Sequence, residues 1–317
     1  KYQDAINAYR RAYRYSRNDP AWLLKISDCY YRMGEVGDAL SQLELAVVSN
    51  PNLIEAHQRQ LEILFKMMGR TAPAKHMKRL EESAQKLIEL IPEAQAQTDP
   101  AKRKLLAEAH HAYGLALYSR RSENEALAQQ GVAEIKKALA LDPNVEYLRS
   151  LGMVASAEID ESLRYATEPN VSLSDFDRYV GRMRGALRDA EQAHQAVRQD
   201  RPGEGVITFA LADLYHMLWA PLESRLAGVC QAQVRGREAL LKQNAEQLKD
   251  LDARTDLSAL DKRQLRQRLT QQDTQVQRDL TQWRMRASDH ANARDQAVKT
   301  TLALYDEALN QVTDSAV

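Results

Sequence analysis

Residues 19–51, DPAWLLKISDCYYRMGEVGDALSQLELAVVSNP, carry the spacing of small and large residues that decides the fold. At an offset of 34 residues, small side chains fall on small ones and a large one falls on a large one: Ala5 on Ala39, Ala12 on Ala46, and Tyr9 on Leu43. Small residues are needed where two helices cross closely, and a bulky residue fills the space between them. A repeat of this length and pattern predicts stacked pairs of helices.

The stretch resembles one complete tetratricopeptide repeat. Its matching positions cover two helices, the turn between them and the closing proline: Leu23, Ile26, Ser27, Tyr30, Gly34, Ala39, Leu43, Ala46 and Pro51. Ser27 stands where the family prefers glycine, and Trp22 lies one residue before the family's usual tryptophan position. The opening residues 1–12, KYQDAINAYRRA, resemble the second helix of a repeat whose first helix is absent. We therefore expect the natural protein to continue upstream, with this chain a fragment or a processed product.

Two later units resemble the repeat more loosely. Residues 109–118 resemble a first helix with Tyr113 and Gly114 at the close-packing point, and residues 131–144 resemble a second helix. Residues 147–152 again resemble the start of a first helix. The resemblance implies an all-α, tetratricopeptide-like α-solenoid of antiparallel helix pairs. We expect repeats over 1–142, divergent repeat-like helices over 143–220, and a long helical hairpin, similar to a coiled coil, over 221–317.

Four dipeptides combine a capping residue with proline and predict helix starts: Asp19-Pro20, Asn50-Pro51, Asp99-Pro100 and Asp142-Pro143.

In the C-terminal third, Ser258 and Asp261 predict another start, followed by a helix to about residue 312. Its predicted apolar seam has a period of about 3.6 residues, which is typical of a straight helix: Val276, Leu280, Trp283, Ala287, Ala291, Val298, Leu302, Tyr305, Leu309 and Val312. We expect 222–286 to form a projecting hairpin and 287–312 to pack back on the solenoid. The alternative is a compact bundle with a break near Trp283 or Ser288.

The charge balance argues against broad electrostatic roles. Lys+Arg and Asp+Glu are equal at 44 each, so no global field attracts nucleic acid or an anionic membrane. The basic run 262–268 is a local exception that could contact RNA or an acidic protein, or be a solvated surface.

The most apolar stretch, 206–222, contains Asp213, His216 and Pro221, so we expect a buried helix rather than a membrane span. Cys29 and Cys230 form no disulfide framework. We slightly prefer a cytoplasmic location, with a periplasmic or secreted one open if a signal lies upstream.

Catalytic motifs are absent from the sequence, so we expect no enzyme activity, no cofactor and no metal. His110 and His111 are adjacent on a predicted helix and point about 100° apart, which does not suit chelation of one metal. Asp213 and His216 have a spacing that could share a metal or make a core hydrogen bond, and they are the place where an enzyme site would lie.

The resemblance implies that the first helices of the repeats line a groove that binds peptides. The candidate partner-binding residues repeat at the same offset on successive first helices: Lys25, Asp28, Tyr31 and Arg32, then Arg59, Glu62, Phe65 and Lys66, with Tyr118 in the third unit. Alternatively, Asp28 with Arg32 and Glu62 with Lys66 satisfy each other along one helix. Leu24 and Asp28 replace the lysine and asparagine of the chaperone-type carboxylate clamp, so that role is not expected.

These patterns predict a non-catalytic scaffold that binds protein partners, as a homo- or hetero-oligomer, with the groove for one partner and the hairpin for another. The alternative is a structural subunit permanently integrated in a larger complex, in which seam residues such as Trp283 and Leu302 are buried by another chain.

Overall fold

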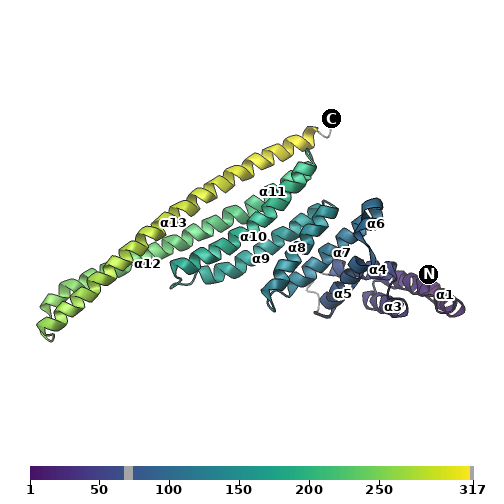
Figure 1. Cartoon of the computed structure of the whole chain (residues 1–317), viewed down its shortest axis with the longest axis horizontal. Helices are drawn as coiled ribbons and strands as arrows, with labels where there is room; N and C mark the ends of the chain where they lie inside the picture. Colours follow the sequence, from purple (N-terminus) through teal and green to yellow (C-terminus); the bar gives the residue numbers. More distant parts are fainter. Residues whose placement is uncertain (68–73, 315–317) are drawn as a thin grey trace. The chain divides into compact units, whose positions relative to one another are not determined.

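The computed structural model describes residues 1–67 and 74–314, and over these residues the chain is helical with no strand. It divides into two compact units, Lys1–Leu151 and Gly152–Val317, coloured purple to teal and teal to yellow in Figure 1. The predicted all-α class is confirmed.

Unit 1 is a series of helices, most of which pack on the next helix in the chain. Its elements are α1 (Tyr2–Tyr15), α2 (Ala21–Arg32), α3 (Val36–Ser49), α4 (Ile54–Met67), α5 (Ala74–Leu90), the short α6 (Glu93–Thr98), α7 (Pro100–Ser119), α8 (Glu125–Leu141) and the start of α9 (Val145–Ala166). The first helices of successive pairs are α2, α4 and α7, and the second helices are α3, α5 and α8.

Of the four predicted helix starts, the one at α7 is capped by the predicted residue, and the one at α2 follows a turn in which the predicted residue bonds, although its N-cap is Pro20. Asp99 accepts hydrogen bonds from the backbone N–H groups of Ala101 and Lys102, and Asp19 accepts one from Ala21. The other two helices begin later, α4 at Ile54 and α9 at Val145. Before α9 the cap is Asn144 rather than Asp142, because the Asn144 side chain accepts the N–H of Glu146.

Small residues hold the helix pairs together, as the repeat pattern predicts. Ala39, Leu43 and Ala46 of α3 are fully buried. The Ser27 hydroxyl of α2 donates a 2.9 Å hydrogen bond to the carbonyl oxygen of Ala39. Ser27 therefore allows the close approach for which the family prefers glycine, and it also satisfies a polar atom inside the crossing.

A very close crossing in unit 1 joins α7 and α8. A Cβ atom placed on Gly114 would lie 2.6 Å from the carbonyl oxygen of Gly131, and one on Gly131 would lie 2.6 Å from that of Gly114. Neither approach is possible for a residue with a side chain, because the obstacle on each side is backbone. Gly114 at the close-packing point of the third unit is thus a confirmed prediction.

Gly114→Ala should destabilise unit 1 by about 1–3 kcal/mol, because the added methyl group forces α7 and α8 apart. The matched control is Gly37→Ala in α3, where an added Cβ meets nothing within 4 Å. That change should stabilise the protein by up to about 1 kcal/mol through helix propensity. Thermal and chemical denaturation followed by circular dichroism measure both. Equal effects of the two substitutions would contradict the crossing.

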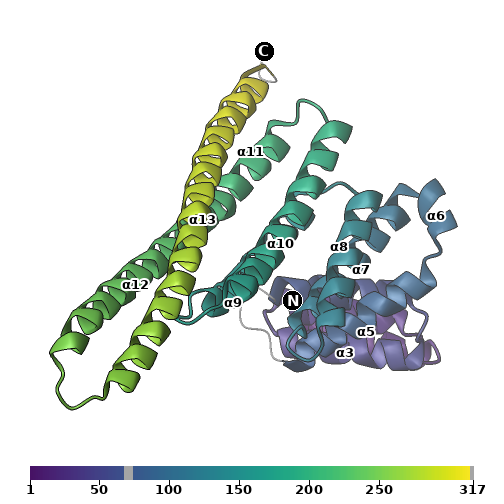
Figure 2. The ribbon, with the colours of Figure 1, turned by 60° about the vertical axis from the view of Figure 1, so that its left-hand side comes forward.

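Unit 2 contains the remainder of α9, α10 (Leu173–Asp200), α11 (Gly205–Leu214), the π-helical turn η1 (Tyr215–Trp219), α12 (Ala220–Ala253) and α13 (Ala259–Asp314). In η1 the N–H of Ala220 bonds to the carbonyl of Tyr215, five residues earlier, just before Pro221. Such a turn accommodates the proline, which lacks an N–H group. Figures 1 and 2 both show α12 and α13 side by side as an antiparallel hairpin.

The helix α13 is continuous over its 56 residues, so the alternative of a break near Trp283 or Ser288 is wrong. The Ser258 hydroxyl accepts the N–H of Asp261, as predicted for its start. Along the described part of the chain, one continuous helical stretch, Gly205–Leu251, is long and apolar enough to cross a membrane. A core helix of a folded domain passes the same test, so this stretch is weak support for a membrane span.

The predicted seam of α13 is right in its first half and wrong in its second. Val276, Leu280 and Trp283 are buried. Near the C-terminus, however, the buried positions are Ala297, Thr301, Leu304 and Ala308, while four predicted seam residues are exposed: Val298, Leu302, Leu309 and Val312. The seam rotates because the end of α13 also packs on α11, with smaller residues at that contact.

A buried charge network joins α10, α12 and α13. The Glu223 carboxylate is almost fully buried; it accepts two bonds from Arg184, Nε at 2.7 Å and Nη2 at 2.8 Å, and one from His290 Nδ1 at 2.5 Å. Burial raises the pKa of Glu223, but the hydrogen bonds from His290 and Arg184 outweigh it and the net shift is downward. The network therefore stabilises unit 2 while Glu223 is ionised.

Glu223→Gln should lower the free energy of unfolding by about 3 kcal/mol near neutral pH, because it removes one partner of a buried ion pair. A depressed carboxyl pKa stabilises the fold above its unfolded value of about 4.3, and that contribution is lost as the pH falls through the folded pKa. The gap between wild type and variant should therefore shrink on acidification in urea titrations. The exposed Glu246→Gln is the control. A gap that stays constant with pH would contradict this role.

Candidate functional site

Two contacts join the facing surfaces of the first helices α2 and α4. Asp28 of α2 forms a 2.7 Å ion pair with Arg59 of α4. The Lys66 ammonium of α4 lies 5.6 Å from the ring centroid of Tyr31 of α2. Four of the predicted partner-binding residues thus come together across two successive repeats, and all four remain at least partly exposed.

Three further charged residues predicted to bind a partner lie on the same two helices. Lys25 and Arg32 are exposed on α2, and Glu62 accepts a 3.1 Å hydrogen bond from Gln58 on α4. The ion pair of Asp28 links two repeats rather than two positions along one helix. The alternative pairing of Asp28 with Arg32 is therefore replaced by a contact between helices.

Phe65 begins a row of rings that continues along later first helices. Its ring lies 5.1 Å from His111 of α7, and His111 lies 4.4 Å from Tyr147 of α9. His111 Nε2 is 2.7 Å from the hydroxyl of Ser150. The sequence pattern missed His111 and Tyr147 because the third repeat starts late, which breaks the 34-residue offset. The helical patterns at 109–118 and 147–152 were the signals that could have located them.

Tyr118, the predicted third aromatic of the groove, lies elsewhere. It is buried at the α7–α8 crossing, where its backbone and Cβ approach Gly131. The Arg121 guanidinium lies 5.0 Å from the Tyr118 ring centroid. Little of this side chain is available to a bound chain.

Carboxylates gather beside the ring row. Burial raises the pKa of Glu108 on α7; Lys104 opposes this, and the nearby charges of Glu62 and Asp142 raise the pKa further. The first-helix face, by which we mean the facing surfaces of α2, α4 and α7, therefore has exposed cations on α2, and the carboxylates of Glu62 and Glu108 with Lys104 beside them toward α7.

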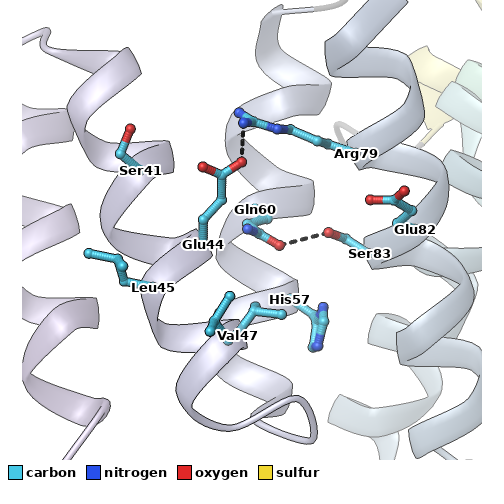
Figure 3. Close-up of a pocket in the computed structure, with 10 residues that line it drawn as sticks. Ser41, Glu44, Leu45, Val47, His57, Gln60, Arg79, Glu82 and Ser83 are labelled. Atoms are coloured by element: carbon cyan, nitrogen blue, oxygen red, sulfur yellow. Dashed lines mark hydrogen bonds and ion pairs between the residues drawn. The ribbon is translucent and has the colours of Figure 1, made fainter. Parts of the chain in front are cut away.

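A separate cavity of about 630 Å³ lies between α3, α4 and α5 (Figure 3). The ion pair of Glu44 with Arg79 and the 2.8 Å hydrogen bond from Ser83 to Gln60 cross it. Its lining residues come mostly from second helices: Ser41, Glu44, Leu45, Val47, Val48, His57, Gln60, Arg79, Glu82 and Ser83. The repeat pattern gave no signal for this cavity, because the pattern marks helix crossings and not the surface between α3 and α5.

Asp213 and His216 are both exposed, and each lies beside Tyr305 of α13. Asp213 accepts a 2.7 Å hydrogen bond from the hydroxyl of Tyr305, and the His216 ring lies 6.3 Å from the Tyr305 ring. Across residues 1–67 and 74–314, no cluster of three or more His, Cys, Asp or Glu side chains is placed to hold a metal ion.

His111 should make unit 1 sensitive to acid. Burial lowers the pKa of His111 to about 4, whereas an unfolded histidine has a pKa of about 6.5. Between these values the unfolded chain binds the extra proton, so the free energy of unfolding should fall by about 1.4 kcal/mol per pH unit on acidification. His111→Phe should reduce the slope in denaturation titrations by this amount and leave the contributions of His57 and His194, whose pKa values burial also lowers. An unchanged slope would show that His111 is not buried in neutral form.

Comparison with known proteins gives one family. A model described as tetratricopeptide repeat matches residues 1–61. No curated protein matches the chain. Among solved structures, a monomeric mutant of IFIT1 with Gppp-AAAA is similar at 12% sequence identity and a TM-score of 0.30, over 97% of this chain and 76% of that one. The family match over residues 1–61 agrees with the helix pairs that the structure shows there, and residues 1–61 are therefore similar to the tetratricopeptide repeat family.

Proposed function

We propose that the chain is a non-catalytic scaffold that binds a segment of a partner protein along the first-helix face of unit 1. The observation that carries the proposal is the surface shared by α2 and α4, where Asp28 pairs with Arg59 and Lys66 covers Tyr31. These contacts hold half-exposed side chains in fixed positions. A preorganised surface loses less entropy when a partner binds.

The charges of the first-helix face favour a partner segment whose two ends carry opposite charges. Lys25 and Arg32 would attract carboxylates, because both are exposed cations near the α2–α4 contacts. Glu62 and Glu108 would attract a lysine or arginine toward α7. Tyr31, held beside Lys66, offers an aromatic contact of the kind that dominates binding energy at interfaces. The proposed ligand is therefore an extended segment with acidic residues at one end and a basic residue at the other.

The hairpin of α12 and α13 supports a second attachment point. It is a long pair of helices with mostly polar outer faces, and a 2.7 Å hydrogen bond from Asn244 to Asp273 lies in its seam. A rigid arm of this kind suits a protein that connects partners. We propose this role for the hairpin as the second part of the scaffold function.

Tyr31→Ala should weaken partner binding about tenfold or more, because an aromatic anchor is removed from the centre of the face. The measurement is quantitative affinity purification from native extract, comparing wild type with the variant. Tyr15→Ala on α1 is the control, since Tyr15 is highly exposed and lies away from α4. The supporting result is a set of proteins retained by wild type and Tyr15→Ala but lost by Tyr31→Ala.

Phe65→Ala is a poor probe of the same face, because the Phe65 ring packs on His111 and its loss would also destabilise unit 1. Tyr31 also packs partly on the core of unit 1, so circular dichroism must show that Tyr31→Ala is folded at the temperature of the binding assay. Identical protein sets for the folded variant and wild type would remove the first-helix face from the proposal.

A further inference from the structure

We propose that two copies of the chain associate as a symmetric antiparallel pair through an apolar stripe on α13. The stripe consists of Val298, Leu302, Tyr305, Leu309 and Val312. Four of its side chains are substantially exposed, at 44% for Val298, 61% for Leu302, 54% for Leu309 and 47% for Val312. Branched apolar residues exposed in a row on one helix are typical of an interaction surface rather than of a solvated one.

The stripe is a second apolar face on a helix that already has one. The buried positions of this part of α13 are Ala297, Thr301, Leu304 and Ala308. Four of the five stripe residues each directly follow one of these buried residues in the sequence, and consecutive residues of a helix point about 100° apart. Within unit 2 the side chains of Val298, Leu302 and Leu309 on this face are left exposed, while the neighbouring face packs on α11. Tyr305 and Val312, at the edge of the stripe nearest α11, also contact that helix.

Contacts with α11 and η1 fix the stripe in place. The Tyr305 hydroxyl donates its hydrogen bond to Asp213, and the Tyr305 ring lies 5.9 Å from Phe209. Val312 packs so closely on Gly205 that a Cβ there would lie 2.7 Å from it. Met217 of η1, 65% exposed, adds apolar surface beside α13. The stripe is thus part of a supported surface.

The spacing of the stripe is symmetric about Tyr305. Leu302 precedes it by three residues and Leu309 follows by four, while Val298 and Val312 lie seven residues before and after. In an antiparallel pair that crosses at Tyr305, Leu302 of one copy meets Leu309 of the other, and Val298 meets Val312. A two-fold interface requires this self-complementarity, and the alternating spacing of the stripe provides it.

The charged residues beside the stripe fit the same arrangement. Lys299 and Asp306 lie three residues before and four residues after Leu302, so both flank it on one side. In the antiparallel pair Lys299 lies about 7.5 Å along the helix axis from Asp306 of the second copy, within reach of a lysine side chain. The two aspartates approach each other, and the two lysines neutralise them. The flank therefore has no net charge and favours a second copy.

The length of the stripe sets the expected affinity between the two copies. Its 15 residues span about 22 Å of helix, so the interface is at the small end of specific interfaces and the dissociation constant should be micromolar. Sedimentation equilibrium from about 1 to about 200 µM brackets that affinity. The average mass should rise from 35.9 kDa toward twice that value. A mass that stays at 35.9 kDa at every concentration would overturn the proposal. The stripe would then be a binding surface for a different protein.

Leu302→Glu and Leu309→Glu should each keep the chain monomeric over the whole range, with the melting curve of wild type, since both positions are exposed. Met285→Glu is the matched control, because Met285 is 58% exposed on the same helix but lies outside the stripe. It should associate like wild type. Association that survives both leucine variants, or that Met285→Glu also abolishes, would contradict the assigned surface.

The antiparallel register has its own test. Leu302→Cys and Leu309→Cys chains, mixed in equal amounts and oxidised gently, should form the mixed disulfide faster than either chain alone forms its own. The natural Cys29 and Cys230 are buried and should not interfere. Equal rates for all three combinations would overturn the antiparallel arrangement.

Discussion

The close approach of paired helices at small residues is the constraint on which the repeat unit depends. At the α7–α8 crossing the backbones of Gly114 and Gly131 leave no room for a Cβ atom, and at the α2–α3 crossing Ser27 bonds directly to the backbone of Ala39. These crossings set the spacing of the pairs. Because the pairs are tight, successive first helices lie near enough for Asp28 to reach Arg59 and for Phe65 to reach His111. The candidate site is a consequence of that spacing.

Unit 2 is held by a different interaction. Its long helices meet through side-chain contacts such as the Glu223 network and the edge-on packing of Phe176 against Trp283, whose ring centroids are 4.9 Å apart. Long helices leave faces that their own unit cannot cover. The stripe of α13 is such a face. A chain that binds in unit 1 and associates through unit 2 would present two copies of its first-helix face, which raises the effective affinity for a repeated partner.

The sequence predicted those features that depend on helix crossings. Ala39, Ala46 and Gly114 were identified from the repeat alone, because the requirement for a small residue there is local and strict. The continuous α13 followed from its 3.6-residue period. The rotation of its seam did not, because apolar residues occupy two faces near the C-terminus and only tertiary packing selects Leu304 over Leu302.

The candidate site was predicted less completely for a similar reason. The offset of 34 residues placed Asp28, Tyr31, Arg59 and Lys66 on one face, and the structure brings these four together. It could not place His111 or Tyr147, because the longer connection before α7 breaks the offset, and Tyr118 was assigned to the face by a register that no longer applied. The pairing of Asp28 with Arg59 also lies beyond sequence reasoning, since pairing along α2 satisfies the same local rules.

The row of rings from Phe65 through His111 to Tyr147 tests the stacking of the first helices most directly, because its three residues come from α4, α7 and α9. Proton NMR of selectively labelled protein would detect nuclear Overhauser effects between these rings. The structure predicts cross-peaks from His111 to both neighbours, whose ring centroids lie 5.1 and 4.4 Å away. Their absence in a folded protein would mean that the first helices do not stack as described, and the first-helix face would not exist.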